Sequence, residues 1–297
     1  MTRPPGLGRV VIMRFSVCIP NFGDFADPRA VAKVASAAEE AGWDGLFVWD
    51  HVVLDKRPGR PFGDPWILLA AAALATSRVR LGPMVTPVAR RRPQQLARLV
   101  STLDNLSGGR VVFGVGLGAP LDAEYADFGE SADPKAIAEK LDEGVDLIAR
   151  FWTGEPVTFS GKHFTARDIT LLPAPVQRPR PPVWVAGRWP NRRPMRRAAR
   201  WDGVVPIFES AGPTGLPELA EVRDLIAYIR SQRTADAPFD VVVGGTSPND
   251  PAKARSLVAP LAEAGVTWWE ESLPFGSADE DKLEPVLRRV EAGPPVL

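Results

Sequence analysis

One dipeptide, Asp-Pro, opens four helix-like segments of this chain. It occurs at residues 27–28, 64–65, 133–134 and 250–251, and a run rich in small and apolar residues follows each time. Aspartate caps the free backbone N–H groups at the start of a helix, and proline suits the first helical position because no N–H donor is needed there. The four pairs therefore predict four helix starts spread along the whole chain.

Short apolar runs alternate with these helices. Runs at 14–20, 79–86, 111–116, 183–186 and 240–243 predict strands, and three similar segments at 41–48, 199–206 and 263–270 each join a helix end to a strand. We count eight strands and eight helices in strict alternation, which predicts parallel strands. Eight such units in 297 residues fit a closed (β/α)8 TIM barrel better than an open doubly wound sheet, which remains the alternative fold.

The alternation is interrupted once, over residues 153–182. This stretch predicts an inserted hairpin followed by a Pro-rich connector, and it contains His163 as a surface residue. The opening residues 1–12, "MTRPPGLGRVVI", predict a loose N-terminal extension. Residues 13–297 would then form a single domain.

Composition limits the classes of partner. Acidic and basic residues balance at 36 each, so no overall field attracts nucleic acid or an anionic membrane. No apolar stretch approaches the roughly 20 residues of a membrane span. The single cysteine, Cys18, excludes an internal disulfide and is expected to be a buried, inert thiol. We expect a cytoplasmic protein that binds a small molecule and neither nucleic acid nor membrane.

Two ionisable residues follow the second strand directly. The run "GLFVWDHVV" delivers Asp50 and His51 at the strand's carboxyl end. Active sites of (β/α)8 barrels lie at the carboxyl ends of the strands. An imidazole at that position can hold or relay a proton near neutral pH, so we take His51 and Asp50 as candidate catalytic residues.

Glycine and proline residues lie at the ends of the next two predicted strands. Residues 82–87, "GPMVTP", predict a bulge or unusual backbone where a flat ligand can approach. Gly114, Gly116 and Gly118 alternate in "FGVGLG" without the helix start of a dinucleotide fingerprint. Their pattern is equally compatible with tight packing and with ligand approach.

Two later strand ends carry further candidates. Gly187 before an expected helix start, followed by Arg188, predicts an anion-binding turn, whereas the arginines over 192–197 are more typical of a solvated face. The last strand places two tryptophans and then Glu270 and Glu271 at the rim, where they can pack a ring system or the rim itself.

Three blocks together resemble the luciferase-like family of flavin- and deazaflavin-dependent oxidoreductases, the bacterial luciferase-like monooxygenase superfamily. They are "EEAGWDGLFVWDHV", the segment from "LATSRVRLGPMVTPVARRRP" through "LDNLSGGRVVFGVGLG", and "PVWVAGRWP" with "RRAARWDGVVP". The resemblance covers almost the whole chain from Met13 and implies a (β/α)8 barrel with an insertion, which agrees with the count of units above.

The resemblance also implies where a cofactor ring lies. The backbone at Met84-Val85 would be a bulge with a non-prolyl cis peptide behind the ring, Asp50 and His51 would lie beside its reacting edge, and the turn at 187–188 would bind phosphate. The implied cofactor-binding residues are Asp50, His51, Met84, Val85, Thr86, Gly116, Gly118, Gly187 and Arg188, and no metal site is implied.

Two departures concern the substrate. Relatives that oxidise sugar phosphates carry a Trp shortly after the His and a Glu after the second G-x-G step, where this chain has "HVVLDK" and Ala119. A sugar-phosphate substrate is therefore disfavoured, and the substrate stays an unidentified small organic molecule. The same resemblance favours a homodimer.

The alternatives cover three classes of function. The first is an oxidoreductase that uses reduced coenzyme F-420 (F420), an 8-hydroxy-5-deazaflavin, for hydride transfer, or reduced FMN for monooxygenation. The others are a barrel hydrolase with Asp50 and Glu270 as paired carboxylates and a flavin-binding barrel without catalysis. F420 is slightly favoured over FMN because Arg90–Arg92 and Arg192–Arg193 would receive the carboxylates of its oligoglutamate tail.

Overall fold

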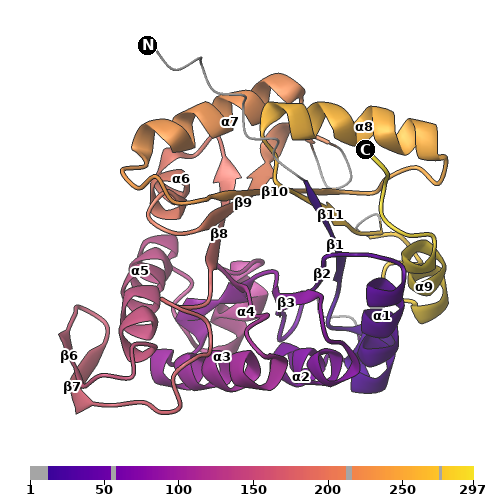
Figure 1. Cartoon of the computed structure of the whole chain (residues 1–297). Helices are drawn as coiled ribbons and strands as arrows, with labels where there is room; N and C mark the ends of the chain where they lie inside the picture. Colours follow the sequence, from indigo (N-terminus) through magenta and orange to yellow (C-terminus); the bar gives the residue numbers. More distant parts are fainter. Residues whose placement is uncertain (1–12, 55–57, 212–215, 274–275) are drawn as a thin grey trace, which may run out of the picture.

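The computed structural model describes residues 13–54, 58–211, 216–273 and 276–297. The expected extension over 1–12 lies outside these residues. Within them, parallel strands form a ring in the order β3-β2-β1-β11-β10-β9-β8-β5-β4 (Figure 1). The strands are β1 (Arg14–Ile19), β2 (Gly45–Val48), β3 (Arg80–Pro83), β4 (Thr86–Pro87), β5 (Phe113–Gly116), β8 (Val183–Trp189), β9 (Gly203–Phe208), β10 (Asp240–Gly245) and β11 (Trp268–Glu271).

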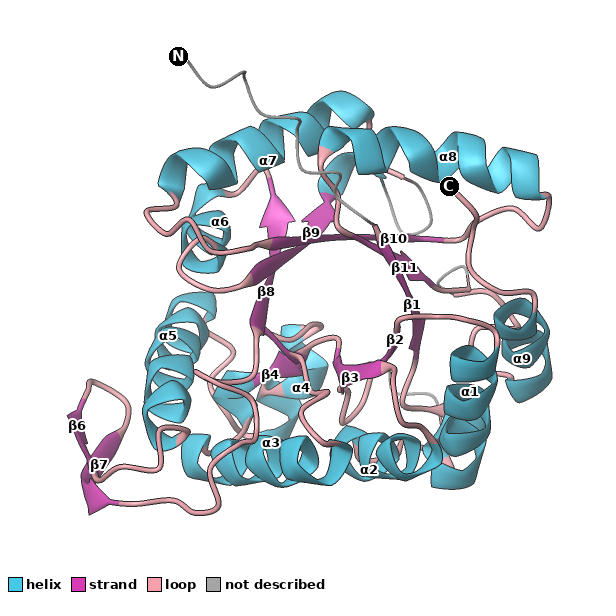
Figure 2. Ribbon diagram, viewed as in Figure 1, coloured by secondary structure: helices cyan, strands magenta, loops and turns pink. Residues whose placement is uncertain are grey.

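The ring is a (β/α)8 barrel because β3 and β4 are two halves of one strand. They are separated by Met84 and Val85, and a bridge from Leu81 to Val111 joins this strand to the chain just before β5. Figure 2 shows the helices surrounding the ring of strands. The expected closed barrel is confirmed, and the open sheet is excluded.

A helix follows each barrel strand. The surrounding helices are α1 (Pro28–Glu40), α2 (Pro65–Ala75), α3 (Pro93–Ser107), α5 (Pro134–Phe151), α6 (Arg192–Ala198), α7 (Leu219–Gln232), α8 (Pro251–Ala264) and α9 (Leu283–Glu291), and a short α4 (Leu121–Glu124) precedes α5. All four Asp-Pro pairs start a helix as expected, and each aspartate accepts a hydrogen bond from an N–H group of the first turn. Among the described helices, none has the length and apolar character needed to cross a membrane.

The predicted insertion is a small antiparallel hairpin. Strands β6 (Val157–Ser160) and β7 (Thr165–Ile169) pair beside α5, away from the ring (Figure 1). His163 lies at the hairpin turn, and its Nε2 atom is 3.0 Å from Oε2 of Glu139 on α5. The hairpin therefore holds His163 against α5, and His163 itself does not line the cavity described below.

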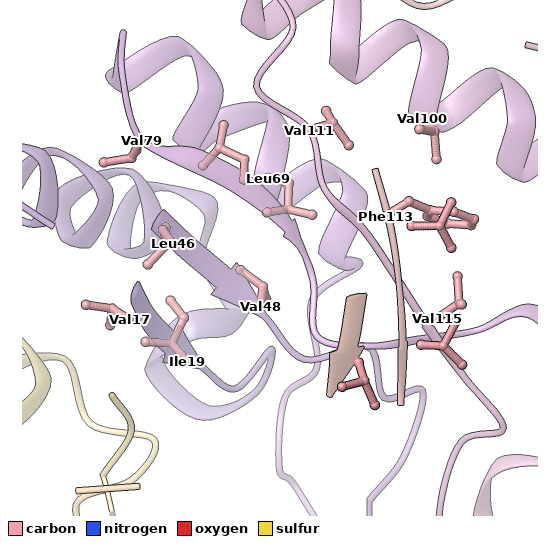
Figure 3. Close-up of a cluster of buried hydrophobic side chains, with 14 of the residues drawn as sticks. Val17, Ile19, Leu46, Val48, Leu69, Val79, Val100, Val111, Phe113 and Val115 are labelled. Carbon is pink, nitrogen blue, oxygen red and sulfur yellow. The ribbon is translucent and has the colours of Figure 1, made fainter. Parts of the chain in front are cut away.

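Outward and inward side chains of the barrel form two separate cores. Outward residues such as Val17, Leu46 and Val115 pack under the helices, and Figure 3 shows this layer beside β1, β2 and β5. Inward, the rings of Trp184 and Trp268 lie 5.2 Å apart, and Phe47 contacts both. This aromatic group fills the barrel, so a ligand can enter only above it.

Glycines let the broken strand press against β5. A Cβ atom on Gly82 would lie 2.0 Å from the carbonyl oxygen of Val112, and one on Gly114 would lie 2.2 Å from that of Pro83. Real side chains do not approach a backbone oxygen so closely. These two glycines therefore permit the bulge at residues 84–85.

We predict that Gly82→Ala lowers the free energy of unfolding by about 2 kcal/mol or more, because overpacking against a fixed backbone forces the two strands apart. Urea denaturation followed by circular dichroism measures this change. Gly244→Ala on β10 is the control, since its Cβ would meet no atom closer than 3.4 Å. Equal stability of the two variants would contradict the close packing of β3 on β5.

Candidate functional site

An open cavity of about 2210 Å³ lies at the carboxyl ends of the barrel strands. Eight of the nine predicted cofactor-binding residues line it, namely Asp50, His51, Met84, Val85, Gly116, Gly118, Gly187 and Arg188. The ninth, Thr86, is fully buried and lies behind the wall. The structure thus brings together residues that are up to 138 positions apart in the sequence.

Asp50 is held by three neighbours. Its side chain is 1% exposed and accepts hydrogen bonds from the Thr86 hydroxyl and from the guanidinium groups of Arg90 and Arg91. The Arg91 contact measures 3.0 Å. Asp50 therefore has both oxygens engaged. A hydrolase that paired Asp50 with Glu270 would have to use this carboxylate, whose two oxygens are already bound.

Arg90 joins Asp50 to a second carboxylate. One end of its guanidinium pairs with Glu124 on α4, and the other donates to Asp50, including a 3.1 Å bond to the Asp50 carbonyl oxygen. The Glu124 side chain is completely buried. The buried cation thus lies between two buried anions, and Arg91 supplies a second positive charge at Asp50.

His51 completes this chain of contacts. Its Nδ1 atom lies 2.8 Å from Oε1 of Glu124. Its backbone N–H and carbonyl groups are both bound to the buried side chain of Asn21, at 3.2 and 2.7 Å. These contacts fix both the ring and the backbone of His51 at the cavity wall.

The surroundings keep His51 neutral. Burial of the imidazole and the positive charge of Arg90 lower its pKa from 6.5 to about 4, although the charge of Asp50 acts in the opposite direction. A neutral ring donates its Nδ1 hydrogen to the Glu124 carboxylate, which leaves Nε2 without a proton. His51 can therefore accept a proton or a hydrogen bond at Nε2 throughout the neutral pH range.

The peptide bond between Met84 and Val85 is cis, as the family resemblance implies. Both residues line the cavity on the side of β4. Gly116 faces this bulge, since a Cβ there would lie 2.6 Å from Cγ2 of Val85. Gly118 has a φ of +84°, a conformation that favours glycine. The glycines of this wall thus serve packing, and they also leave the backbone open to the cavity.

The turn after β8 differs from the expectation. Gly187 lies inside β8, which continues to Trp189, and α6 begins only at Arg192. A Cβ on Gly187 would lie 2.4 Å from Pro194, so this glycine allows the turn to fold back on the strand. No helix start follows Gly187 directly. Arg188 is exposed at the cavity edge, and its side chain has no hydrogen bond or ion pair with any described residue.

The arginines after β4 also differ from the expectation. The side chains of Arg90 and Arg91 are 7% and 20% exposed, and both are bound to carboxylates. They cannot receive the acidic tail of a cofactor, so that prediction was wrong for both, and of the three only Arg92 is exposed. Arg192 and Arg193 do line the cavity, as expected.

Sequence reasoning missed Glu124 and Asn21. Glu124 follows the "GLG" step within a few residues, and an acidic residue so close to a predicted strand end was a usable signal. Asn21 follows the first strand after one residue, Pro20, and offered the same kind of signal. Both were passed over because the sequence does not show their contacts with His51.

The cavity suits a cofactor together with a substrate. A pocket for one drug-sized molecule measures about 300 to 1000 Å³, and this cavity is larger. The wall offers a flat backbone surface at β4 and β5, and the edge offers a free arginine cation. A (β/α)8 barrel with these features defines an enzyme that holds an organic cofactor beside a small substrate.

The comparisons with known proteins specify the class. Residues 13–280 match the family described as luciferase-like monooxygenase. The chain belongs to this family, and it is a flavin- or deazaflavin-dependent oxidoreductase of the luciferase-like type.

Two curated relatives carry the same name, F420-dependent glucose-6-phosphate dehydrogenase. The protein from Beutenbergia cavernae is 36% identical over 247 residues, which cover 78% of this chain and 68% of the relative. The protein from Nakamurella multipartita is 34% identical over 178 residues, which cover 59% of this chain and 49% of the relative. The chain thus spans about half the length of the second relative.

Two solved structures share the fold at low identity. Monooxygenase RslO1 from Streptomyces bottropensis has a TM-score of 0.74 at 21% identity, covering 94% of this chain and 97% of its own. The oxygenating constituent of 3,6-diketocamphane monooxygenase from Pseudomonas putida, in complex with FMN, has a TM-score of 0.74 at 18% identity and covers 95% and 96%. Proteins similar to this chain thus include relatives named as F420-dependent and, at the level of the fold, a monooxygenase constituent solved in complex with FMN.

We predict that Glu124→Gln lowers the free energy of unfolding by about 3 kcal/mol or more, because it leaves the buried Arg90 cation with one anion fewer. Urea denaturation at pH 7 measures the loss. Asp122→Asn, on the exposed face of the same helix, is the matched control and is expected to change stability by less than about 0.5 kcal/mol. A Glu124 variant as stable as this control would contradict the buried charge network.

Proposed function

We propose that this protein transfers a hydride between coenzyme F420 and a small organic substrate, with His51 as the residue that exchanges the substrate's proton. One observation carries this proposal: His51 is neutral and fixed at the cavity wall, with Nδ1 bound to Glu124. When bound, the deazaflavin would accept or return the hydride.

His51 would act as a general base in the oxidative direction. A substrate hydroxyl donates its proton to Nε2 while the hydride leaves the adjacent carbon. The imidazolium that forms is stabilised by the Glu124 carboxylate, 2.8 Å from Nδ1. In the reverse direction, the same atom returns the proton to the carbonyl oxygen.

The roles of the other site residues follow from their positions. Asp50 and Thr86 would orient Arg90, which in turn holds Glu124. Met84, Val85, Gly116 and Gly118 would support the cofactor ring, and Gly187 with Arg188 would lie near its phosphate.

F420 is favoured over FMN by the two curated relatives, both named as F420-dependent. The FMN-bound neighbour keeps FMN-dependent monooxygenation as the second candidate function. We do not propose glucose 6-phosphate, the substrate in the relatives' names, for this chain. Ala119 in the cavity lining departs from the pattern of a Glu after the second G-x-G step that the family resemblance associates with sugar phosphates.

His51→Ala is expected to lower turnover by about 10² to 10⁴, the range for loss of a positioned acid or base. Affinity for the cofactor should change by only a few-fold. Steady-state kinetics with an identified substrate, together with a cofactor titration, separate the two effects. Unchanged turnover would remove His51 from the mechanism.

Cofactor choice is tested by fluorescence titration with F420 and with FMN at low and high salt. We expect the affinity for F420 to fall more with salt than the affinity for FMN, because the acidic tail of F420 would meet the exposed cations of Arg192 and Arg193. Arg188→Ala should weaken F420 binding by about 1.5 to 3 kcal/mol, whereas Arg223→Ala, exposed on α7, should leave it unchanged. Tighter FMN binding at both salts, with turnover driven by reduced FMN and oxygen, would favour the monooxygenase.

We also propose a homodimer that buries the outer face of α2. The whole helix is apolar, yet Ile67 and Leu74 are 60% and 75% exposed. These two residues are two turns apart and lie on the same face of the helix. The neighbouring helix α3 adds the exposed Leu106. Light scattering coupled to gel filtration should give a dimer for the wild type and a monomer for Ile67→Lys/Leu74→Lys. A wild-type monomer would contradict this assembly, and Leu172→Lys, on the connector after β7, is the control.

A further inference from the structure

Glu270 lies on the opposite side of the cavity from the bulge at Met84-Val85. It is on β11, and the ring order places β10 and β11 across the barrel from β3 and β4 (Figure 2). Side chains alternate along the strand: Trp268 points into the barrel and Trp269 points outward, so Glu270 points inward again. Glu270 therefore stands one layer above the aromatic group that fills the barrel.

The neighbouring strand leaves room beside this carboxyl group. Gly244 on β10 is the register partner of Glu270. A Cβ on Gly244 would lie 3.4 Å from Oε1 of Glu270, so any larger side chain there would cover the carboxyl group. Both residues line the cavity, and a ligand can reach the carboxyl group from that side.

Glu270 lacks the hydrogen-bond donors that surround Asp50 on the opposite wall. Asp50 is bound by a hydroxyl group and two guanidinium groups. By contrast, Oε2 of Glu270 is shielded from solvent and has no hydrogen-bond partner among the described residues. The thiol of Cys18 on β1 is hydrogen-bonded to the carboxyl group and is the titratable group that faces it.

Among the described residues, burial and the Cys18 thiol are the causes that act on the charge of Glu270, and no cation is among them. Burial raises its pKa from 4.5 to about 7, and the thiol contact offsets this only in part. The negative charge of Glu270 in turn helps to raise the pKa of Cys18. The thiol is a weak donor, and the buried Oε2 atom has no partner among the described residues, which is costly for a carboxylate. A ligand that brings a stronger donor therefore stabilises the charged form. Rotation about the last side-chain bond, which is broad for glutamate, presents either oxygen.

We infer that Glu270 is a substrate-binding residue that accepts a hydrogen bond from a hydroxyl or protonated amine group of the substrate, at a position away from the reacting carbon. This inference rests on the proposed function, because that function puts the cofactor at the β4 wall and leaves the β10 and β11 wall to the substrate. The substrate class is then a small organic molecule with a second, donating polar group.

The test is calorimetric titration of the full-length protein at pH 8 with three probes of similar shape. Benzylamine and benzyl alcohol carry donors, and acetophenone carries only an acceptor. We expect the wild type to bind benzylamine at least about tenfold more tightly than acetophenone, the size of one hydrogen bond to a charged group. Glu270→Ala and Glu270→Gln should each remove most of this preference while leaving acetophenone binding unchanged. Glu209→Gln, at an exposed position of the same cavity, should retain the preference.

A second readout observes Glu270 itself. The infrared difference spectrum between wild type and Glu270→Gln reports the protonated carboxyl group. Adding benzylamine should shift its titration to lower pH, because a bound donor favours the charged form. Equal binding of all three probes by the wild type, or equal weakening of all three in both Glu270 variants, would overturn the inference.

Cofactor titration separates a failure of the Glu270 site from a failure of the proposed function. Normal cofactor binding with no preference for a donor probe would contradict the Glu270 site alone. A wild-type protein that binds neither F420 nor FMN would contradict the proposed function.

Discussion

The site depends on one buried cation, the guanidinium group of Arg90. It lies between the carboxylates of Asp50 and Glu124 and ties the end of β2 to the segment after β4 and to the short helix α4. Loss of Arg90 would leave the buried Glu124 carboxylate without its cation and Asp50 with Arg91 alone, and an unpaired buried ion costs several kcal/mol. The network therefore holds three loops of the cavity wall in one arrangement.

This arrangement decides what His51 can do. Glu124 is bound to Arg90 through Oε2, and its Oε1 atom meets Nδ1 of His51. Arg90 thereby orients the carboxylate, and its positive charge also opposes protonation of the imidazole. The same cation thus fixes the ring and keeps it neutral, so that Nε2 remains a proton acceptor. On the other side of the barrel, Glu270 has no such cation as a partner within the described part of the chain, so the carboxyl groups of the two walls differ in their charge partners.

Much of the fold was predictable because its signals are local. Each Asp-Pro pair acts within the first helical turn, and each strand is a short apolar run, so eight units could be counted without knowing their contacts. Asp50 and His51 were also found by position, at a strand end. Local reasoning failed where a long-range contact decides the role. Arg90 was expected at the rim, but it is buried by Asp50 and Glu124, which lie 40 and 34 residues away. Glu124 was missed for the same reason, and Gly187 was expected before a helix that in fact starts at Arg192.

The mechanism requires a neutral His51 with its hydrogen on Nδ1. Nitrogen-15 NMR of protein labelled at histidine measures this state, because the chain has only two histidines, His51 and His163. We expect one ring whose Nδ1 is protonated and whose Nε2 is not, with a pKa near 4, and Glu124→Gln should perturb this signal and leave the other unchanged. A His51 pKa above about 6, close to that of free histidine, or a hydrogen on Nε2 would rule out this role for His51.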